Sequence, residues 1–218
     1  MKRFLCFVTF LLILAACGPR ERNATQVQGV PAIWPDYVGV TVPATIAPLD
    51  FTLPGADALD VRVTAPDGSS LRSSGKSATC FSEKSWKSLL KHSVGDALTV
   101  TVSGLFGGAW RRYEPFQIFV SGDEIDYGLT YRLIEPGYQI YSNMGIYERE
   151  LGSFRQRALL ENTRFAGCVN CHASFRGDPS AFTVHIRGAH GATLLGRDGE
   201  VKAYDTKTDS TLGFCVYP

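Results

Sequence analysis

The stretch Leu98-Thr99-Val100-Thr101-Val102 alternates apolar and polar side chains along its whole length. A period of two places the apolar side chains on one face of a β-strand, and Val and Thr favour strands. Residues 38–42 and 60–64 alternate in the same way, residues 116–120 and 131–134 are two further strand-like runs, and turn residues separate these segments. The sequence therefore predicts a mainly β chain with an antiparallel β-sandwich over residues 37–138.

One segment inside this region has a different period. Trp86, Leu89 and Leu90 recur at helical spacing within residues 82–90, which predicts a short helix lying on the sandwich. The composition favours a β-rich globular chain over a helical bundle, because the 218 residues are 44% hydrophobic and include 22 Gly and 11 Pro.

The N-terminus has the pattern of a bacterial lipoprotein signal. Lys2 and Arg3 precede an apolar run, residues 4–16, that is too short for a transmembrane helix of about 20 residues. The run ends in Leu14-Ala15-Ala16-Cys17-Gly18, where small residues admit the signal peptidase. Cys17 is therefore the predicted site of lipidation, and an ordinary signal peptide cut near Ala16 is the alternative.

This pattern predicts a lipid-anchored protein of the cell envelope. We expect a signal peptide over residues 1–17 and a polar tether over residues 18–36. Gly18, rather than an acidic residue, follows the lipidated position, which favours the outer membrane over the inner membrane. The expected location is thus the cell envelope, with the chain lipid-anchored and either facing the periplasm or held in the outer membrane.

Charge and motifs argue against two broad classes of function. The chain has 22 basic and 21 acidic residues, and loss of Lys2 and Arg3 with the signal leaves 20 against 21. With no basic run, nucleic-acid binding is not expected. The sequence contains no nucleophile elbow, phosphate loop or zinc-protease helix, so it does not predict an enzyme. Glu148, Glu150 and Glu161 are expected to be solvated.

Residues 139–218 are predicted to form a small irregular or helical segment that ends in a β-hairpin. Apolar residues mixed with Glu and Arg over residues 143–163 indicate short helical turns. Residues 193–195 and 200–204 are two β-like runs on either side of Asp198-Gly199, a dipeptide typical of two-residue hairpin turns.

Between these two parts lies Cys168-Val169-Asn170-Cys171-His172, the attachment pattern for a c-type haem. Two thiols at this spacing can each add to one haem vinyl group, and the following imidazole can bind the iron. Export supports this interpretation, because c-type haem is attached outside the cytoplasmic membrane. The motif predicts one haem c, with Cys168 and Cys171 carrying it and His172 binding iron.

Two further histidines leave the ligand set open. His185 or His190 could supply the sixth iron ligand, as could Met144, or that position could stay open to a small ligand. Cys168, Cys171, His185 and His190 are also separated by two, 13 and four residues, a spacing typical of a Cys₂His₂ zinc site. A third interpretation is a redox pair or disulfide between Cys168 and Cys171.

Two cysteines remain after these assignments. Cys6 lies within the signal peptide, which leaves Cys80 and Cys215 as a candidate disulfide in an oxidising compartment. Such a bond would connect the sandwich to the end of the chain. Two unconnected thiols are the alternative, since sequence does not supply the Cα separation that a disulfide requires.

The order of segments resembles a family of large bacterial envelope lipoproteins. The resemblance is carried by residues 46–51, 131–138, 144–151, 168–172 and 185–192. In that family an N-terminal all-β region precedes a C-x-x-C-H segment and a TolB-like β-propeller, and some members are cytochrome-like. The haem prediction implies an electron-transfer role or a redox- or ligand-sensing role, with an envelope redox partner or a separate propeller-type protein as partner. The resemblance also implies that residues 216–218 stand where longer relatives enter the propeller.

Overall fold

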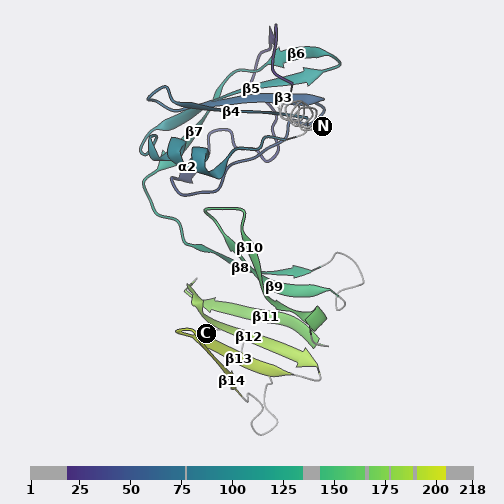
Figure 1. The fold of residues 1–218 in the computed structure, drawn as a ribbon, viewed down its shortest axis with the longest axis vertical. Helices are drawn as coiled ribbons and strands as arrows, with labels where there is room; N and C mark the ends of the chain where they lie inside the picture. The colour runs from purple at the N-terminus through teal and green to yellow at the C-terminus, as the bar shows by residue number, and fades with distance from the viewer. Residues whose placement is uncertain are drawn as a thin grey trace, which may run out of the picture. The chain divides into compact units, whose positions relative to one another are not determined.

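The computed structural model describes residues 19–76, 78–134, 143–164, 167–176, 178–188 and 191–204. Within them the protein is mainly β, with three sheets and one short helix (Figure 1). The chain divides into two compact units between Ile125 and Asp126. This boundary precedes the expected one at residue 138, because the predicted strand at residues 131–134 pairs within the second unit.

The first unit contains one sheet of seven strands, with the order β1-β6-β5-β3-β4, β7 beside β5 and β2 beside β7. Their bounds are β1 Thr25–Gln26, β2 Thr41–Pro43, β3 Ala58–Thr64, β4 Ser70–Gly75, β5 Ala97–Phe106, β6 Ala109–Arg112 and β7 Phe116–Ser121. β3, β5 and β7 confirm three of the predicted strands. The β1–β6 and β2–β7 pairs are parallel and the others antiparallel.

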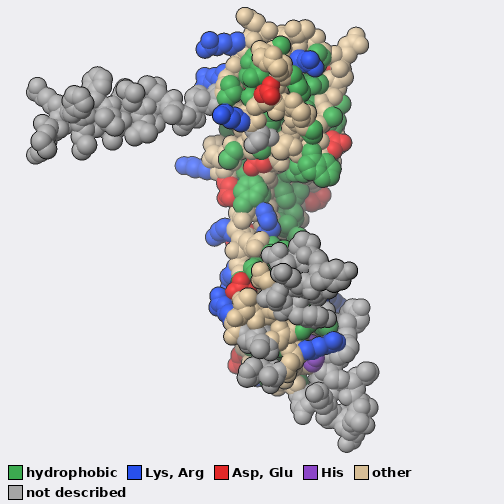
Figure 2. Space-filling view, turned by 90° about the vertical axis from the view of Figure 1, so that its right-hand side faces the viewer, with side chains coloured by type: hydrophobic (Ala, Val, Ile, Leu, Met, Phe, Trp, Pro, Cys, Tyr) green, Lys and Arg blue, Asp and Glu red, His purple; other side chains and the backbone are tan. Residues whose placement is uncertain are grey.

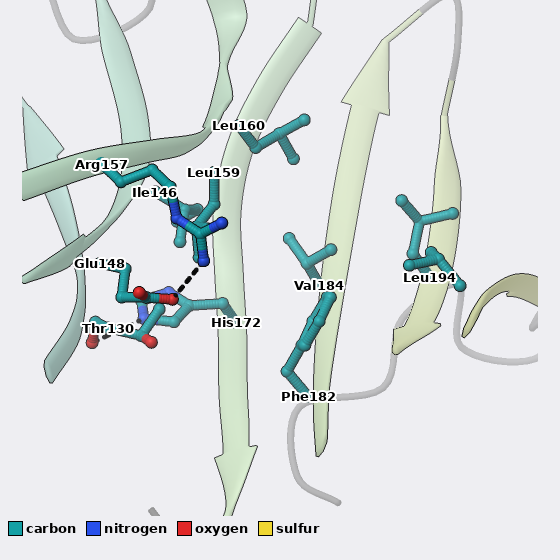
Figure 3. A pocket seen from close by; sticks show the side chains of 11 residues that line it. Thr130, Ile146, Glu148, Arg157, Leu159, Leu160, His172, Phe182, Val184 and Leu194 are labelled. Carbon is teal, nitrogen blue, oxygen red and sulfur yellow. Dashed lines mark hydrogen bonds and ion pairs between the residues drawn. The ribbon is translucent and has the colours of Figure 1, made fainter. Parts of the chain in front are cut away.

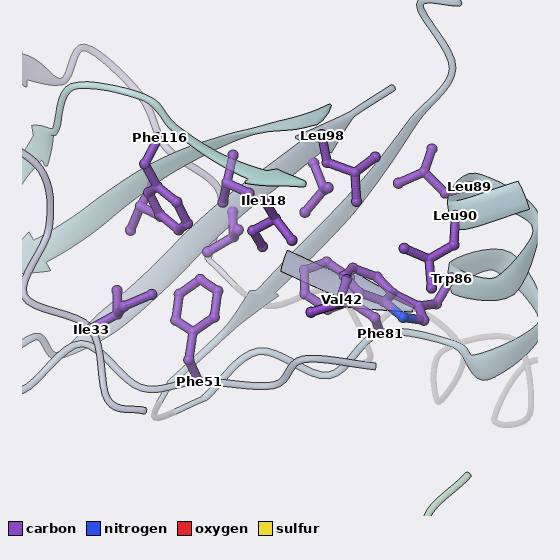
Figure 4. Packing of buried hydrophobic residues seen from close by; sticks show 14 of the residues in the cluster. Ile33, Val42, Phe51, Phe81, Trp86, Leu89, Leu90, Leu98, Phe116 and Ile118 are labelled. Carbon is purple, nitrogen blue, oxygen red and sulfur yellow. The ribbon is translucent and has the colours of Figure 1, made fainter. Parts of the chain in front are cut away.

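The predicted antiparallel sandwich is wrong for the described part of this unit, because all seven strands belong to one hydrogen-bonded sheet. A helix and irregular segments, rather than a second sheet, cover its apolar face. The predicted helix is confirmed as α2, Glu83–Lys91, which buries Trp86, Leu89 and Leu90. These side chains pack with those of the strands in a single core (Figure 4).

Residues 19–36, which the sequence predicted to be a tether, are part of the first unit. Ile33 is buried in the core, and Trp34 exchanges two backbone hydrogen bonds with Thr52. β1 pairs with β6 and adds a strand to the sheet edge. The tether prediction was wrong here because the polar composition of this segment gives no sign of the contacts that hold it to the sheet.

The second unit contains two antiparallel sheets. One has the order β10-β9-β8 and the other the order β11-β12-β13-β14. Their bounds are β8 Gly128–Ile134, β9 Met144–Glu150, β10 Gln156–Glu161, β11 Gly167–Phe175, β12 Asp178–Gly188, β13 Ala192–Arg197 and β14 Glu200–Tyr204, with a 3₁₀ turn η2 at Asn162–Arg164. Ile146, Val169 and Val184 form a small core between the sheets.

Two expectations for this unit are wrong. The helical turns predicted at residues 143–163 are the β9–β10 hairpin, in which Met144, Ile146 and Glu148 are buried at every second position. The C-x-x-C-H segment, predicted to be irregular or helical, is strand β11. Period-two burial and pairing with neighbouring strands outweigh the weak helical preference of the Glu and Arg residues.

The predicted terminal hairpin is confirmed as β13–β14. Arg197 pairs with Glu200, and the two residues between them have positive φ angles, 53° at Asp198 and 80° at Gly199. Two positive φ values in a two-residue loop define a type I′ turn.

The described residues contain no helix long and apolar enough to cross a bilayer. Lys and Arg side chains are interspersed with Asp and Glu on the face drawn in Figure 2, in keeping with their near-equal numbers. Neither sign of charge dominates the molecule.

Candidate functional site

The C-x-x-C-H motif lies on β11, and the pairing of β11 with β12 determines which way its side chains face. Cys168 pairs with Arg187 and Cys171 with His185, whereas His172 pairs with Val184. Directly paired residues of antiparallel strands share a face, and neighbours along a strand alternate. The two thiols and His185 therefore lie on one face of the sheet, and His172 lies on the other.

A β-bulge falls inside the motif. The register shifts between Val169 and Cys171, so Asn170 is an extra residue without a direct partner in β12. A bulge of this kind interrupts the ladder of hydrogen bonds and bends the strand. The hydrogen-bonded ladder of β11 is thus interrupted within the motif itself.

His172 faces the interior of the second unit. Its Nε2 lies 3.4 Å from the carbonyl oxygen of Thr130 on β8, a long and weak contact. Its Nδ1 is buried and has no hydrogen-bond partner. A buried polar nitrogen without a partner costs about 1–3 kcal/mol, so this site is unfavourable for the imidazole unless something else binds it.

A cavity of about 320 Å³ lies beside His172 (Figure 3). Its walls are mainly apolar, and the lining residues are Thr130, Ile146, Glu148, Arg157, Leu159, Leu160, His172, Phe182, Val184, Leu194 and Val201. Both sheets of the second unit contribute to it. The arrangement suits a ligand with an apolar body and a group that an imidazole can bind.

One ion pair lines the same cavity. Arg157 Nη2 donates to Glu148 Oε2 at 2.8 Å across the β9–β10 pair. The Glu148 side chain is only 11% exposed, which corrects the expectation that it is solvated. The signal for this was present in the sequence, because Met144, Ile146 and Glu148 follow a period of two.

The opposite face of β11 carries the thiols. Cys168 and Cys171 are half-buried and unbonded to one another. His185 lies opposite Cys171, and its Nδ1 is 2.9 Å from Thr193 Oγ1 on β13. Within the described ranges, no three His, Cys, Asp or Glu side chains form a group that could hold a metal ion.

Several of the predicted site residues lie outside the described residues. His190, the alternative iron ligand and fourth zinc ligand, is among them, as are Cys17 and Cys215. Cys80 is exposed, and its pairing with Cys215 stays a prediction. Met144 is buried at the start of β9 and does not line the cavity.

The conformation of β11 allows a direct test of the haem prediction. His172 fits the role of an iron ligand, because it has a buried nitrogen without a partner beside an apolar cavity. Cys168 and Cys171 do not fit at the same time, since the sheet separates them from that cavity. Attachment through all three residues requires β11 to open at its bulge.

No protein-family model matches the chain, and no curated protein is detectably similar to it. The resemblance to propeller-containing lipoproteins therefore stays a hypothesis.

Proposed function

We propose that this protein is a non-catalytic lipoprotein of the cell envelope, lipidated at Cys17, that holds one haem c in its second unit and transfers or senses electrons. The observation that supports it best is the buried, unpartnered Nδ1 of His172 beside an apolar cavity. His172 is also the histidine that the Cys168–His172 motif designates as iron ligand. The haem would supply the redox chemistry, and the protein would bind it, orient it and exclude water.

The β-bulge makes the proposal structurally attainable. Because the ladder is already interrupted between Val169 and Cys171, a local change there could turn the thiols toward the cavity. Arg157, whose side chain is 69% exposed at the cavity, is then a candidate partner for a haem propionate. The redox partner would be another envelope protein, and a separate propeller-type protein is the candidate that the resemblance implies.

The test is expression in a periplasm with active haem-attachment machinery, followed by denaturation and a pyridine haemochrome spectrum with metal analysis. We expect about one covalent haem per chain, lost in Cys168→Ala and Cys171→Ala. Cys80→Ala, which removes an exposed thiol of the first unit, is the matched control and should keep its haem. A wild-type protein without haem under these conditions would overturn the proposal.

A second candidate function is favoured by the opposite face of the same strand. Cys168, Cys171 and His185 share that face, and with His190 they form the Cys₂His₂ set that the spacing predicts. The protein would then be a non-enzymatic interaction module with a structural zinc. Cys171→Ser should abolish stoichiometric zinc, whereas His172→Ala should leave it unchanged, because His172 faces the other way.

A further inference from the structure

The outer face of the sheet in the first unit is polar and hollowed. On β3, Leu59, Val61 and Val63 enter the core, so Asp60 and Arg62 between them face the other way. There they line a cavity of about 400 Å³ together with residues of β4, β5, β6 and the N-terminal segment. The full lining is Glu21, Asp60, Arg62, Arg72, Thr101, Ser103 and Arg112.

Glu21 fastens the N-terminal segment to this face. Its backbone N–H donates to Asp60 Oδ2 at 2.7 Å. Its carboxylate accepts a hydrogen bond from Ser103 Oγ at 2.5 Å and forms an ion pair with Arg112. Burial would raise the pKa of Glu21, but the hydrogen bonds from Arg112 and Ser103 hold it below its ordinary value.

The acidic groups of this face are fully occupied by partners within it. Arg72 donates to both carboxylate oxygens of Asp60, through Nε at 2.7 Å and through Nη2. The Glu21 carboxylate accepts hydrogen bonds from Arg112 and Ser103. The three arginines of the cavity therefore outnumber its two carboxylates, and the excess positive charge falls on Arg62.

Arg62 is placed to bind an anion. It is exposed, and no ion pair or hydrogen bond of its side chain occurs within the described residues. Its direct neighbours across the sheet are Arg72 on β4 and Thr101 on β5. Because Arg72 is already paired with Asp60, the uncompensated positive charge at this point of the sheet is that of Arg62, and an anion beside it would neutralise that charge. The hydroxyl of Thr101 is a further donor.

The chain itself limits how far this face can lie from a membrane. Glu21 is four residues after Cys17, and an extended chain spans at most about 3.6 Å per residue. If Cys17 carries lipid in the bilayer, the fastened Glu21 is held within about 14 Å of it. The cavity that Glu21 lines is then held near the membrane surface, within reach of the lipid headgroups.

We propose that this face, with Arg62 at its centre, binds the phosphate of anionic phospholipid headgroups in the membrane that holds the protein. The proposal rests on the lipoprotein part of the proposed function and is independent of haem. Arg62, Arg72 and Thr101 would contact the phosphate, while Glu21 and Asp60 hold the surrounding arginines in place. The first unit would thus be oriented on the membrane rather than free on its anchor.

The test uses the mature chain beginning at Gly18, which lacks the acyl chains. Its flotation is measured with vesicles of phosphatidylcholine alone and of phosphatidylcholine with phosphatidylglycerol. We expect selective binding to the anionic vesicles that high salt abolishes. Arg62→Glu should weaken it by at least about fivefold, and Arg62→Gln by less, in line with the energy of one basic residue at an anionic surface.

Lys87→Glu is the matched control. It makes the same change in charge on an exposed position of α2, which covers the opposite face of the sheet. Circular dichroism verifies that each variant is folded. Equal loss of binding in Lys87→Glu and Arg62→Glu, or equal flotation with both kinds of vesicle, would overturn the proposal. Arg62-dependent binding of inorganic phosphate that displaces the protein from vesicles would assign the site to a free anion instead.

Failure of the anchor and failure of the headgroup site are separable. Mass spectrometry of the N-terminal peptide reports acylation of Cys17 directly. If Cys17 is acylated but the mature chain does not bind anionic vesicles, the lipoprotein proposal stands and the headgroup site is overturned. If Cys17 is not acylated but binding to anionic vesicles still depends on Arg62, the headgroup site stands and the lipid anchor is overturned.

Discussion

Cys171 and His172 are neighbours in the chain but lie on opposite faces of the β11–β12 pair, because Cys171 is opposite His185 and His172 is opposite Val184. The haem and zinc hypotheses therefore use different sides of one sheet. A ligand in the cavity meets His172, whereas a metal bound by the thiols meets His185. Single substitutions can separate the two hypotheses for this reason.

The first prediction concerns the imidazole of His172 in protein that contains neither haem nor metal. Replacing it with leucine removes a buried nitrogen without a partner and adds apolar surface to the wall of the cavity. We expect His172→Leu to raise the free energy of unfolding by about 1 kcal/mol, measured by urea denaturation. His185→Leu is the control, and it should lower that free energy because His185 Nδ1 is within hydrogen-bond distance of Thr193. Destabilisation by His172→Leu would show that the imidazole has a structural role.

The second prediction concerns the packing of α2. Leu90 is fully buried in the core of the first unit, so Leu90→Ala leaves a cavity there. We expect it to lower the free energy of unfolding by roughly 2–5 kcal/mol. Val94→Ala, at a position 49% exposed in the same unit, should change it by less than about 1 kcal/mol. Equal effects of the two would place Leu90 outside the core.

The first unit was predictable wherever one side chain pattern decided the local structure. Val61 and Val100 lie between polar residues in the sequence, and both are core positions, on β3 and β5. The helical spacing of Trp86 and Leu89 likewise predicted α2. Sheet topology did not follow, because the parallel pairs β1–β6 and β2–β7 join segments far apart in the sequence.

The sequence identified the residues of the candidate site but did not predict on which face of the sheet each of them lies. The motif singled out Cys168, Cys171 and His172, but only the pairing with β12 shows that they face opposite ways. A one-residue bulge changes which side chains share a face, and no sequence pattern marked Asn170 as the extra residue. The contact of His172 with Thr130 depends on strands from two different sheets.

The third prediction concerns acid sensitivity of the first unit. Burial would raise the pKa of Asp60, but hydrogen bonds from Arg72 and from the Glu21 N–H lower it below its ordinary value of 3.8. A lowered pKa means that the folded state binds fewer protons than the unfolded state. The stabilisation is therefore complete above the ordinary value and is lost as the pH falls through the lowered one.

Asp60→Asn tests this relationship. At neutral pH we expect it to lower the free energy of unfolding by roughly 2 kcal/mol, because hydrogen bonds to a charged group are lost. The difference from wild type should begin to shrink as the pH falls below about 4, where the unfolded chain binds the proton, and should be lost once the pH has fallen through the lowered pKa of folded Asp60. Thermal unfolding as a function of pH measures it, with the exposed Asp123→Asn as control. A difference that is constant with pH would contradict the assigned cause.

The last prediction concerns the cavity beside His172. A methyl group at Gly196 on β13 would lie 2.2 Å from the ring of Phe182, which lines that cavity. Gly196→Ala must therefore push the ring aside, and we expect it to destabilise the second unit by about 1–3 kcal/mol. Phe182→Leu in the same chain should recover part of this loss, because the smaller side chain vacates the space. A double-mutant cycle measured by urea denaturation gives the coupling, and additive effects of the two substitutions would show that they do not share this contact.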